Sequence, residues 1–246
     1  MKIVAIIPAR YNSSRFPGKP LADICGKPMI RWVYDSIKKS SMISEVYVAT
    51  DDSRIEEECR NNDMNVVMTS KDINTSTERL YEAAKRIKAD LYICVNGDEP
   101  LIDYRVVEEI IPNKFDNKRI FVSNLMTKIK TSPEVMDFTN IKVVVDKFGD
   151  ALLFSRSPIP YPKGSLDFEY YKHVGVLIYN YQALEFFAKT KKGVLETIED
   201  VNEIRFLENG IKLKMVRVDA DTLSVDTPKD LDVVRQIIKN RINERK

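Results

Sequence analysis

The chain has 246 residues and a mass of 28.4 kDa, which fits one large α/β domain or one domain with an attached lobe. Lys and Arg total 39 and Asp and Glu total 37, which gives a net charge of +2. A charge this small gives no strong electrostatic attraction to nucleic acids or membrane surfaces. No run of about 18 apolar residues occurs, and the short apolar start lacks a signal-peptide cleavage site. The three cysteines have no metal-ligand spacing and are expected to be thiols in a reducing cytosol.

The first half of the chain alternates apolar runs with amphipathic stretches. The apolar runs, rich in Val and Ile, predict buried strands at 2–8, 45–50, 65–69 and 90–95. The amphipathic stretches predict helices at 28–39, 53–61 and 76–88. Thr75 or Ser76 is expected to cap the last of these. This alternation implies right-handed crossovers and a mainly parallel sheet flanked by helices.

The second half has a different pattern. It predicts strands at 120–127, 141–146, 151–154, 171–179 and 211–218, with Phe148-Gly149-Asp150 as a hairpin turn. Helices are expected at 181–189, 195–208 and 228–245. Because no linker, repeat or low-complexity tract occurs, the sequence predicts one α/β domain with a smaller mixed-sheet lobe.

A basic loop, residues 10–19, follows the first strand. It holds Arg10, Arg15 and Lys19 together with Ser14 and a glycine. Ligands of parallel sheets bind beyond the carboxyl ends of the strands, and a triphosphate needs fixed donors and cations there. The spacing is neither that of a P-loop nor that of a Rossmann fingerprint. The alternative is a solvated basic loop without a ligand.

Two carboxylates follow predicted strands. Asp98 comes after the strand at 90–95, and Asp226 precedes the last helix. Hydrated Mg²⁺ between protein and phosphates takes carboxylate ligands of this kind. Taken singly, Asp98 has the alternative of an acidic turn and Asp226 that of a helix cap. Two such carboxylates facing one basic loop are much less likely to coincide by accident than either is alone.

These motifs occur in an order that resembles the 3-deoxy-manno-octulosonate cytidylyltransferase (CMP-Kdo synthetase) family. The segments are the stretch from Ile-Ile-Pro-Ala-Arg-Tyr to Pro-Gly-Lys-Pro-Leu at 6–21, Thr-Glu-Arg-Leu at 77–80, Gly-Asp-Glu-Pro at 97–100, Phe-Ser-Arg at 154–156, His-Val-Gly at 173–175, Leu-Glu-Thr-Ile-Glu at 195–199 and Val-Asp-Thr-Pro-Lys-Asp-Leu at 225–231. The resemblance implies a nucleotide-diphospho-sugar-transferase-like fold, a homodimer, and Mg²⁺-dependent formation of a CMP-sugar acid from CTP with release of pyrophosphate. It further implies a cytoplasmic step of lipopolysaccharide or capsule synthesis.

The resemblance also implies roles for individual residues. Arg10, Ser14, Arg15 and Lys19 would hold the triphosphate; Thr77, Glu78 and Arg79 would lie near the nucleoside; Asp98 and Asp226 would bind Mg²⁺; Arg156 and His173 would face the acid. Arg10, Lys19, Asp98 and Asp226 are the residues expected to carry catalysis. One domain, 1–246, would comprise a nucleotide-binding part at about 1–115, an acceptor and dimerisation part at about 116–225, and a C-terminal helix at 226–246.

The departures from the family pattern gather among the residues expected to bind the acceptor. Asn96 replaces a Gln, Leu177 replaces a Tyr, and Asn202-Glu203 replaces a Glu-Gln pair, whereas Tyr179 is kept. Polar groups lost from a polyol site leave partners unpaired, at about 1–3 kcal/mol each. Two possibilities remain open. The chain is either a divergent Kdo enzyme or an enzyme for another anionic acceptor, such as a modified Kdo, another sugar acid or a phosphonate.

Three rival functions are weaker. A glycosyltransferase of related fold wants an Asp-x-Asp motif after a central strand, and here Asp219-Ala220-Asp221 lies near the C-terminus. A nucleotide sensor has no use for two metal carboxylates. A nucleic-acid module is disfavoured because the basic run at 239–246 has no interleaved aromatic residues.

Overall fold

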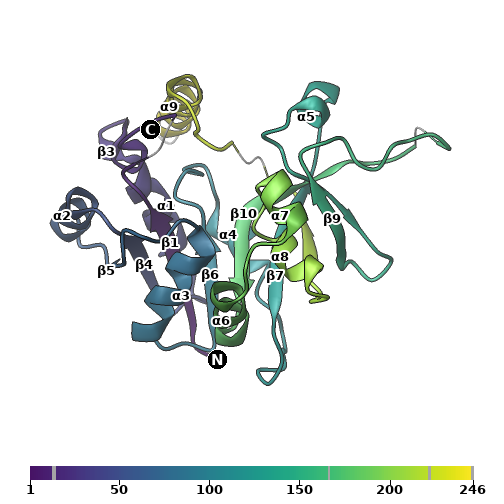
Figure 1. The fold of residues 1–246 in the computed structure, drawn as a ribbon. Coiled ribbons are helices and arrows are strands. Elements are labelled where there is room, and N and C mark those ends of the chain that lie inside the picture. Colours follow the sequence, from purple (N-terminus) through teal and green to yellow (C-terminus); the bar gives the residue numbers. More distant parts are fainter. Residues whose placement is uncertain (13–14, 166, 221–222, 245–246) are drawn as a thin grey trace. The chain divides into compact units, whose positions relative to one another are not determined.

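The computed structural model describes residues 1–12, 15–165, 167–220 and 223–244. Ser14 of the basic loop and Asp221 of the Asp-x-Asp motif therefore lie outside the described residues. The chain divides into two compact units (Figure 1). The first unit comprises Met1–Glu108 and residues 221–246, and the second comprises Glu109–Ala220.

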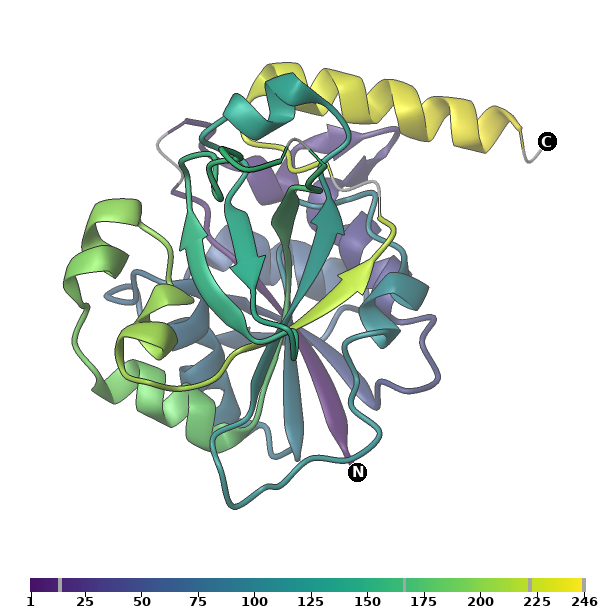
Figure 2. The same ribbon diagram turned by 90° about the vertical axis from the view of Figure 1, so that its right-hand side faces the viewer.

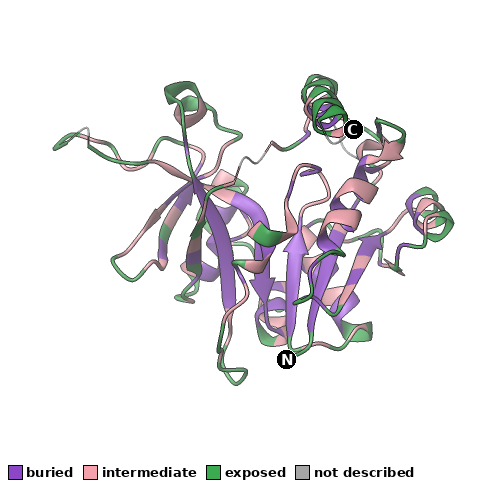
Figure 3. Cartoon of the chain, turned by 180° about the vertical axis from the view of Figure 1, so that it is seen from behind, coloured by how far each residue is buried: buried purple, intermediate pink, exposed green. Residues whose placement is uncertain are grey.

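The first unit contains a four-stranded parallel sheet in the order β6-β1-β4-β5. The strands are β1 (Ile3–Ala9), β4 (Glu45–Thr50), β5 (Val66–Met68) and β6 (Leu91–Val95). Helix α1 (Met29–Ile37) covers one face of this sheet and α3 (Ser76–Arg86) the other (Figures 1 and 3). The strands are mostly buried, as Figure 3 shows. The predicted parallel sheet with helices on both faces is confirmed.

Local signals define the helices of this unit. Helix α2 (Ser53–Asn61) begins after Asp52, whose side chain accepts a hydrogen bond from the Arg54 amide. Helix α3 begins with a capping box, in which the Thr75 hydroxyl and the Glu78 carboxylate satisfy each other's backbone N–H. The predicted cap of α3 is therefore confirmed at Thr75. A short helix, α4 (Tyr104–Glu108), ends this part of the unit.

A small hairpin was not predicted. Strands β2 (Asp23–Ile24) and β3 (Lys27–Pro28) follow the 3-10 turn η1 (Lys19–Leu21), and α1 starts only at Met29. The last helix, α9 (Pro228–Asn243), lies against this hairpin (Figure 2). Their shared apolar cluster consists of Ile24, Met29, Val225, Leu231, Val234 and Ile238. This packing brings the end of the chain back to the first unit.

The second unit contains a mixed sheet in the order β11-β7-β10-β8-β9. Its strands are β7 (Val122–Lys128), β8 (Lys142–Val145), β9 (Ala151–Ser155), β10 (Tyr171–Tyr179) and β11 (Lys214–Val218). Strand β11 is parallel to β7, and the other pairs are antiparallel. The predicted mixed-sheet lobe is confirmed, and the fold is a mainly parallel α/β sheet flanked by helices with this smaller lobe.

One predicted helix of this unit was wrong. Residues 195–208 were expected to form a single helix, but they form α7 (Val194–Glu199) and α8 (Ile204–Glu208). Asp200 ends α7 in the left-handed conformation, with a φ of 50°. The break lets Arg205 of α8 return to Glu196 of α7 in a buried ion pair. The other helices are α5 (Ser132–Met136) and α6 (Tyr181–Lys189).

Two expectations from composition concern the described residues only. In that part of the chain, helices fall short of the length and apolarity that crossing a bilayer requires. Cys25, Cys59 and Cys94 are free thiols, and burial raises the pKa of Cys59 to about 12.

Candidate functional site

The loops after β1 and β6 approach each other closely at the carboxyl end of the first sheet. The strands are neighbours, so the segments that follow them leave the sheet side by side. A Cβ atom on Gly97 would lie 3.2 Å from the Pro8 carbonyl oxygen and 3.1 Å from Ile30 Cδ1. A side chain at this position would require its neighbours on β1 and α1 to shift by a few tenths of an ångström, so glycine favours the close approach of this segment.

The basic loop is shaped by Tyr11. The Gly18 amide donates to the Tyr11 carbonyl at 2.8 Å, and Gly18 has a φ of +72° against the Tyr11 ring. On Tyr11, the Arg54 guanidinium lies 3.2 Å from the ring centroid, and Asp52 holds that guanidinium with two hydrogen bonds. These contacts fix the turn from which Lys19 projects.

Four charged side chains form what we call the ion network: Arg15, Lys19, Asp98 and Asp226. Lys19 Nζ lies 2.8 Å from Asp98 Oδ2 and 3.3 Å from Asp226 Oδ1. Arg15 lies 3.0 Å from the same Asp226 oxygen. The Lys19 side chain is only 13% exposed, whereas that of Arg15 is 57% exposed. The structure thus brings together four of the residues that the sequence singled out, from three distant segments.

Asp226 is not the cap of the last helix. Thr227 is the N-cap of α9 and forms a capping box with Asp230. The Val225 amide donates to the Asp98 carbonyl at 2.8 Å, which places the two acidic segments side by side. The structural alternative for Asp226 is therefore wrong, and its carboxylate is left for Lys19 and Arg15.

The donor set of the ion network fits a hydrated Mg²⁺. Asp98 Oδ1 is buried and has no hydrogen-bond partner among the described residues, while Oδ2 faces Lys19. An unpartnered buried carboxylate oxygen is costly unless a ligand or ion satisfies it. Within the described residues, no group of three or more His, Cys, Asp or Glu could hold a metal alone. Mg²⁺ commonly takes one or two carboxylates and completes its shell with phosphates and water.

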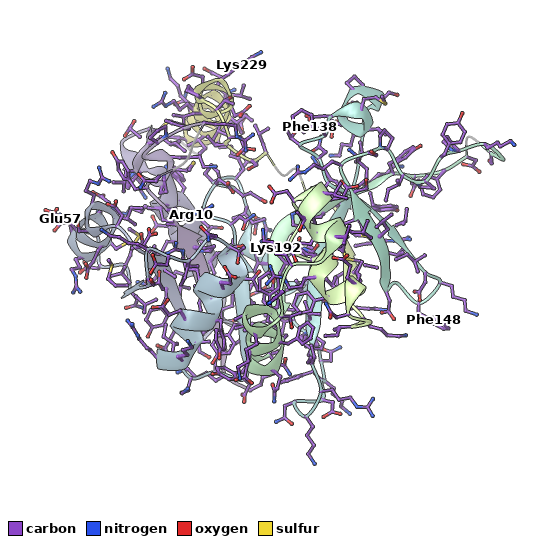
Figure 4. The ribbon with its side chains drawn as sticks, viewed as in Figure 1. Arg10, Glu57, Phe138, Phe148, Lys192 and Lys229 are labelled. Carbon is purple, nitrogen blue, oxygen red and sulfur yellow. The ribbon has the colours of Figure 1, made fainter. Side chains whose placement is uncertain are left out.

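The residues expected near the nucleoside have different surroundings. Arg10 is exposed and donates to the Asn74 carbonyl at 3.0 Å, just before α3 (Figure 4). Glu78 is engaged in the capping box, and Thr77 is buried. Arg79 is only 1% exposed and binds Asp51, Thr69 and the Ile73 carbonyl. Arg79 therefore fixes the loop before α3 from inside the unit.

Arg156, expected to face the acid, is held by backbone carbonyls of the second unit. Its guanidinium donates to the carbonyls of Glu199 at 2.7 Å and of Phe138 and Asp200 at 3.1 Å. The Glu199 carboxylate accepts from the Arg156 amide at 2.8 Å. Arginine has five N–H donors, so these bonds leave two for a ligand. The side chain is positioned before any ligand arrives.

His173 is half-buried in β10, and its Nδ1 lies 3.0 Å from Asn124 Oδ1. Desolvation lowers its pKa, and the neighbouring charges of Glu203 and Arg156 act on it in opposite directions. Arg156, His173 and Glu203 thus share one electrostatic environment. It corresponds to part of the set expected to bind the acceptor.

The remaining residues of that set are distributed more widely. Leu177 and Tyr179 are buried in β10, 4% and 1% exposed, and the Tyr179 ring packs near Phe206. Asn202 lies between α7 and α8 and is half-buried. Asn96 belongs to the first unit, two residues before Asp98.

Sequence reasoning missed Asn124 and Lys142. Asn124 is fully buried in β7, where Ser123 and Thr127 are polar as well, so its amide does not stand out in the sequence. Lys142 is also buried, and its Nζ donates to the carbonyls of Asp137 and Arg156. Burial lowers the pKa of Lys142. No signal in the sequence marks Lys142, because a lysine at the start of a Val-rich strand is usually exposed.

Comparisons with known proteins identify the family of the chain. Residues 4–214 match the family model described as Cytidylyltransferase. The 3-deoxy-manno-octulosonate cytidylyltransferase of Geobacter metallireducens is 43% identical over 95% of this chain and 96% of its own. The protein of the same name from Escherichia coli is 39% identical over 99% of this chain and 98% of its own.

Solved structures give the same assignment. The structure of CMP:2-keto-3-deoxy-manno-octonic acid synthetase complexed with CTP matches with a TM-score of 0.92 at 39% identity, covering 98% of this chain and 100% of that one. A 4-diphosphocytidyl-2C-methyl-D-erythritol synthase from Anaerococcus prevotii matches with a TM-score of 0.64 at 14% identity, covering 97% of this chain and 98% of that one, which shows a shared fold alone. The chain is a nucleotidyltransferase enzyme that belongs to the 3-deoxy-manno-octulosonate cytidylyltransferase (CMP-Kdo synthetase) family.

Proposed function

We propose that the protein transfers CMP from CTP to the hydroxyl of Kdo or a closely related 3-deoxy-2-keto sugar acid, with release of pyrophosphate and dependence on Mg²⁺. The names of its relatives and the CTP complex of a similar protein support the two substrates. The observation that carries the proposal is the position of Lys19 Nζ between the carboxylates of Asp98 and Asp226.

The charge balance of the ion network supports binding of both a triphosphate and a metal. Lys19 and Arg15 offset Asp98 and Asp226, so the network is neutral as it stands. A triphosphate adds negative charge beside two carboxylates, and like charges at close range are costly unless cations neutralise them. Asp98 Oδ1 and Asp226 would hold Mg²⁺, which supplies charge neutralisation at the phosphates and a lowered pKa for the attacking hydroxyl.

The reaction requires positioning more than a covalent nucleophile. In a displacement at the α-phosphate, pyrophosphate leaves with increasing negative charge. Lys19 is held at the base of the basic loop by η1, and Arg15 lies in the loop itself, so both cations stand where a triphosphate would bind. We assign them to stabilising the departing pyrophosphate. Arg10 would contact the phosphates from beside the loop before α3.

We also propose a homodimer in the cytoplasm, acting in lipopolysaccharide or capsule synthesis. The second unit exposes large apolar side chains, among them Phe138 at 66% and Phe148 at 64% (Figure 4). Met136 is 71% exposed. Leu152 and Ile198 are also exposed, at 61% and 74%. We propose that some of these side chains lie in the dimer contact, since most soluble oligomers are assemblies of identical chains.

A second candidate is cytidylyl transfer to a different anionic acceptor. Leu177 supports it, because a buried leucine stands where the family pattern has a tyrosine hydroxyl. A modified Kdo, another sugar acid or a phosphonate would then be the acceptor. The family assignment argues against the rival functions of glycosyltransferase, nucleotide sensor and nucleic-acid module.

The test is pyrophosphate release by the purified protein with CTP, Mg²⁺ and Kdo, alongside a panel of other acids. Fast release with Kdo supports the first candidate. No pyrophosphate release with Kdo, together with release in the presence of another acid, supports the second candidate. No release with any acid, from a protein that binds CTP, contradicts both.

Asn96→Gln combined with Leu177→Tyr refines this choice. If the lost polar groups changed the acceptor, the double variant should turn over Kdo faster than the wild type. Asn96→Gln with Leu177→Phe is the matched control, because it adds the same ring to a buried position without the hydroxyl. Equal rates for the two double variants would show that the hydroxyl has no part in acceptor choice.

A further inference from the structure

The side-chain amide of Asn124 has only one possible orientation. Its nitrogen, Nδ2, donates to the carbonyl of Val174 at 2.8 Å and to that of Val176 at 2.9 Å. Both carbonyls can only accept hydrogen bonds, so a flipped amide would place an oxygen against two oxygens in a fully buried site. The Oδ1 atom of Asn124 must therefore face away from them.

That oxygen lies 3.0 Å from Nδ1 of His173. An amide oxygen accepts but never donates, so the imidazole must carry a proton on Nδ1. In the neutral ring, the lone pair is then on Nε2. Nε2 has no hydrogen-bond partner among the described residues, and His173 as a whole residue is half-buried.

The side-chain amide of Asn124 also binds the backbone next to His173. Strands β7 and β10 change register between His173 and Leu177, and Asn124 lies opposite Leu177. The two carbonyls that Asn124 binds belong to this irregular stretch. Glu203 and Arg156 are the charged groups that act on the ring. Desolvation lowers the pKa of His173 below its ordinary value, which favours the neutral ring.

We infer that Asn124 is a positioning residue that fixes His173 as a hydrogen-bond acceptor through Nε2, for a hydroxyl or amino group of the sugar-acid substrate and not for its carboxylate. The inference rests on the proposed function for the identity of the ligand only. A lone pair repels a carboxylate oxygen and attracts an O–H or N–H. The carboxylate is left to cations, and Arg156 has two N–H donors to offer.

The first test needs no substrate. The chain contains a single histidine, so ¹⁵N-histidine labelling of the untagged protein reports on one ring. Wild-type spectra at neutral pH should show a neutral imidazole protonated on Nδ1. A ring protonated on Nε2, or a cationic ring at that pH, overturns the inference whatever the variants do.

Two variants and one control test the cause. Asn124→Leu removes the amide at similar volume, and His173 should lose its fixed Nδ1–H form. Asn124→Asp keeps an oxygen opposite Nδ1 but sets its second oxygen against the Val174 and Val176 carbonyls, so stability should fall while the Nδ1–H form persists in the folded variant. Ser123→Ala is the matched control on the same strand, since Ser123 bonds the Lys214 carbonyl and should leave the spectrum unchanged. An unchanged spectrum in Asn124→Leu, or loss of the Nδ1–H form in folded Asn124→Asp, contradicts the role of the oxygen.

Kinetics test the ligand. In Asn124→Leu, KM for Kdo should rise by about tenfold, while KM for CTP stays within about twofold. Equal increases for both substrates would indicate a structural defect and contradict a positioning role. If the wild type turns over no Kdo, the proposed acceptor is wrong, yet the ¹⁵N result still decides the ring form.

Discussion

The ion network of the first unit and the surroundings of His173 in the second unit hold their charged side chains in opposite ways. In the first unit, Lys19 and Arg15 bind the carboxylates of Asp98 and Asp226, so cations meet anions from other side chains. In the second unit, Arg156 and Lys142 end on backbone carbonyls, at 2.5–3.1 Å. An ion pair between partly exposed side chains can exchange partners with an incoming ligand. A cation held by carbonyls stays in place.

This difference separates two tasks of a transferase. We propose that the ion network admits phosphates, because its cations can turn from carboxylates to a new anion. The surroundings of His173 are fixed in advance by Asn124, Glu199 and the carbonyls, which suits recognition of a sugar by geometry. Four predictions test whether charge exchange in one unit and rigidity in the other are real.

The largest effect is expected for Asp98→Ala. It removes the oxygen that has no partner among the described residues, and pyrophosphate release should fall by at least about a thousandfold, about 4 kcal/mol. Circular dichroism should show an intact fold. Asp232→Ala, which breaks an exposed pair with Arg235 on α9, is the control and should keep full activity. An unfolded Asp98→Ala protein would instead make that carboxylate structural.

Arg205→Met should cause the next largest effect, on stability rather than on chemistry. Both side chains of the Arg205–Glu196 ion pair are buried, so removing Arg205 leaves the Glu196 carboxylate buried without its charged partner. We expect a loss of about 3 kcal/mol in the free energy of unfolding measured with urea. Lys189→Met breaks an exposed pair with Glu185 and should cost less than about 0.5 kcal/mol. Similar losses for both would show that the second unit is not rigid at this place.

Lys19→Ala should slow turnover by about a hundredfold while weakening CTP binding far less, because its charge matters most as pyrophosphate departs. Steady-state kinetics and calorimetric titration with CTP separate the two quantities. Lys27→Ala, at an exposed pair with Asp35, should leave both unchanged. A defect confined to CTP binding would mean that Lys19 does not exchange partners during the reaction.

The smallest effect concerns pH. The native pKa of His173 is lowered by desolvation, so the unfolded chain binds a proton below about pH 6.5 that the folded chain does not. Stability should therefore fall as the pH decreases from about 6.5, by at most about 1.4 kcal/mol per pH unit. Urea unfolding at about pH 5.5 and 7.5 should show a larger difference for wild type than for His173→Gln. If wild type and His173→Gln lose the same stability between the two pH values, the charge of Glu203 cancels the effect of desolvation on the pKa of His173.

Much of the fold could be predicted because strand and helix periodicity dominate the first unit. The strand at 45–50 and the helix at 53–61 were predicted with the bounds that the structure shows. The wrong helix prediction was caused by tertiary contacts that sequence periodicity does not show. The stretch 195–208 has helical periodicity throughout, yet a left-handed Asp200 and the Arg205–Glu196 pair divide it.

The predicted site shows the same division. Arg15, Lys19, Asp98 and Asp226 could be predicted because each follows or precedes a regular element, and neighbouring parallel strands end together. Asn124 could not, because its importance depends on a register shift between two strands that the sequence does not mark. The carbonyl partners of Arg156 could not be predicted either, because they belong to Phe138, Glu199 and Asp200, which lie far from Arg156 along the chain.

The position of Asp226 has a consequence for how the enzyme is made. Lys19 and Asp226 contact each other although 207 positions separate them along the chain. A ribosome that has synthesised both the basic loop and Asp98 has yet to translate the entire second unit before the second carboxylate emerges. The ion network is therefore assembled last, and a nascent chain is inactive until the unit that we propose binds the acceptor has been made.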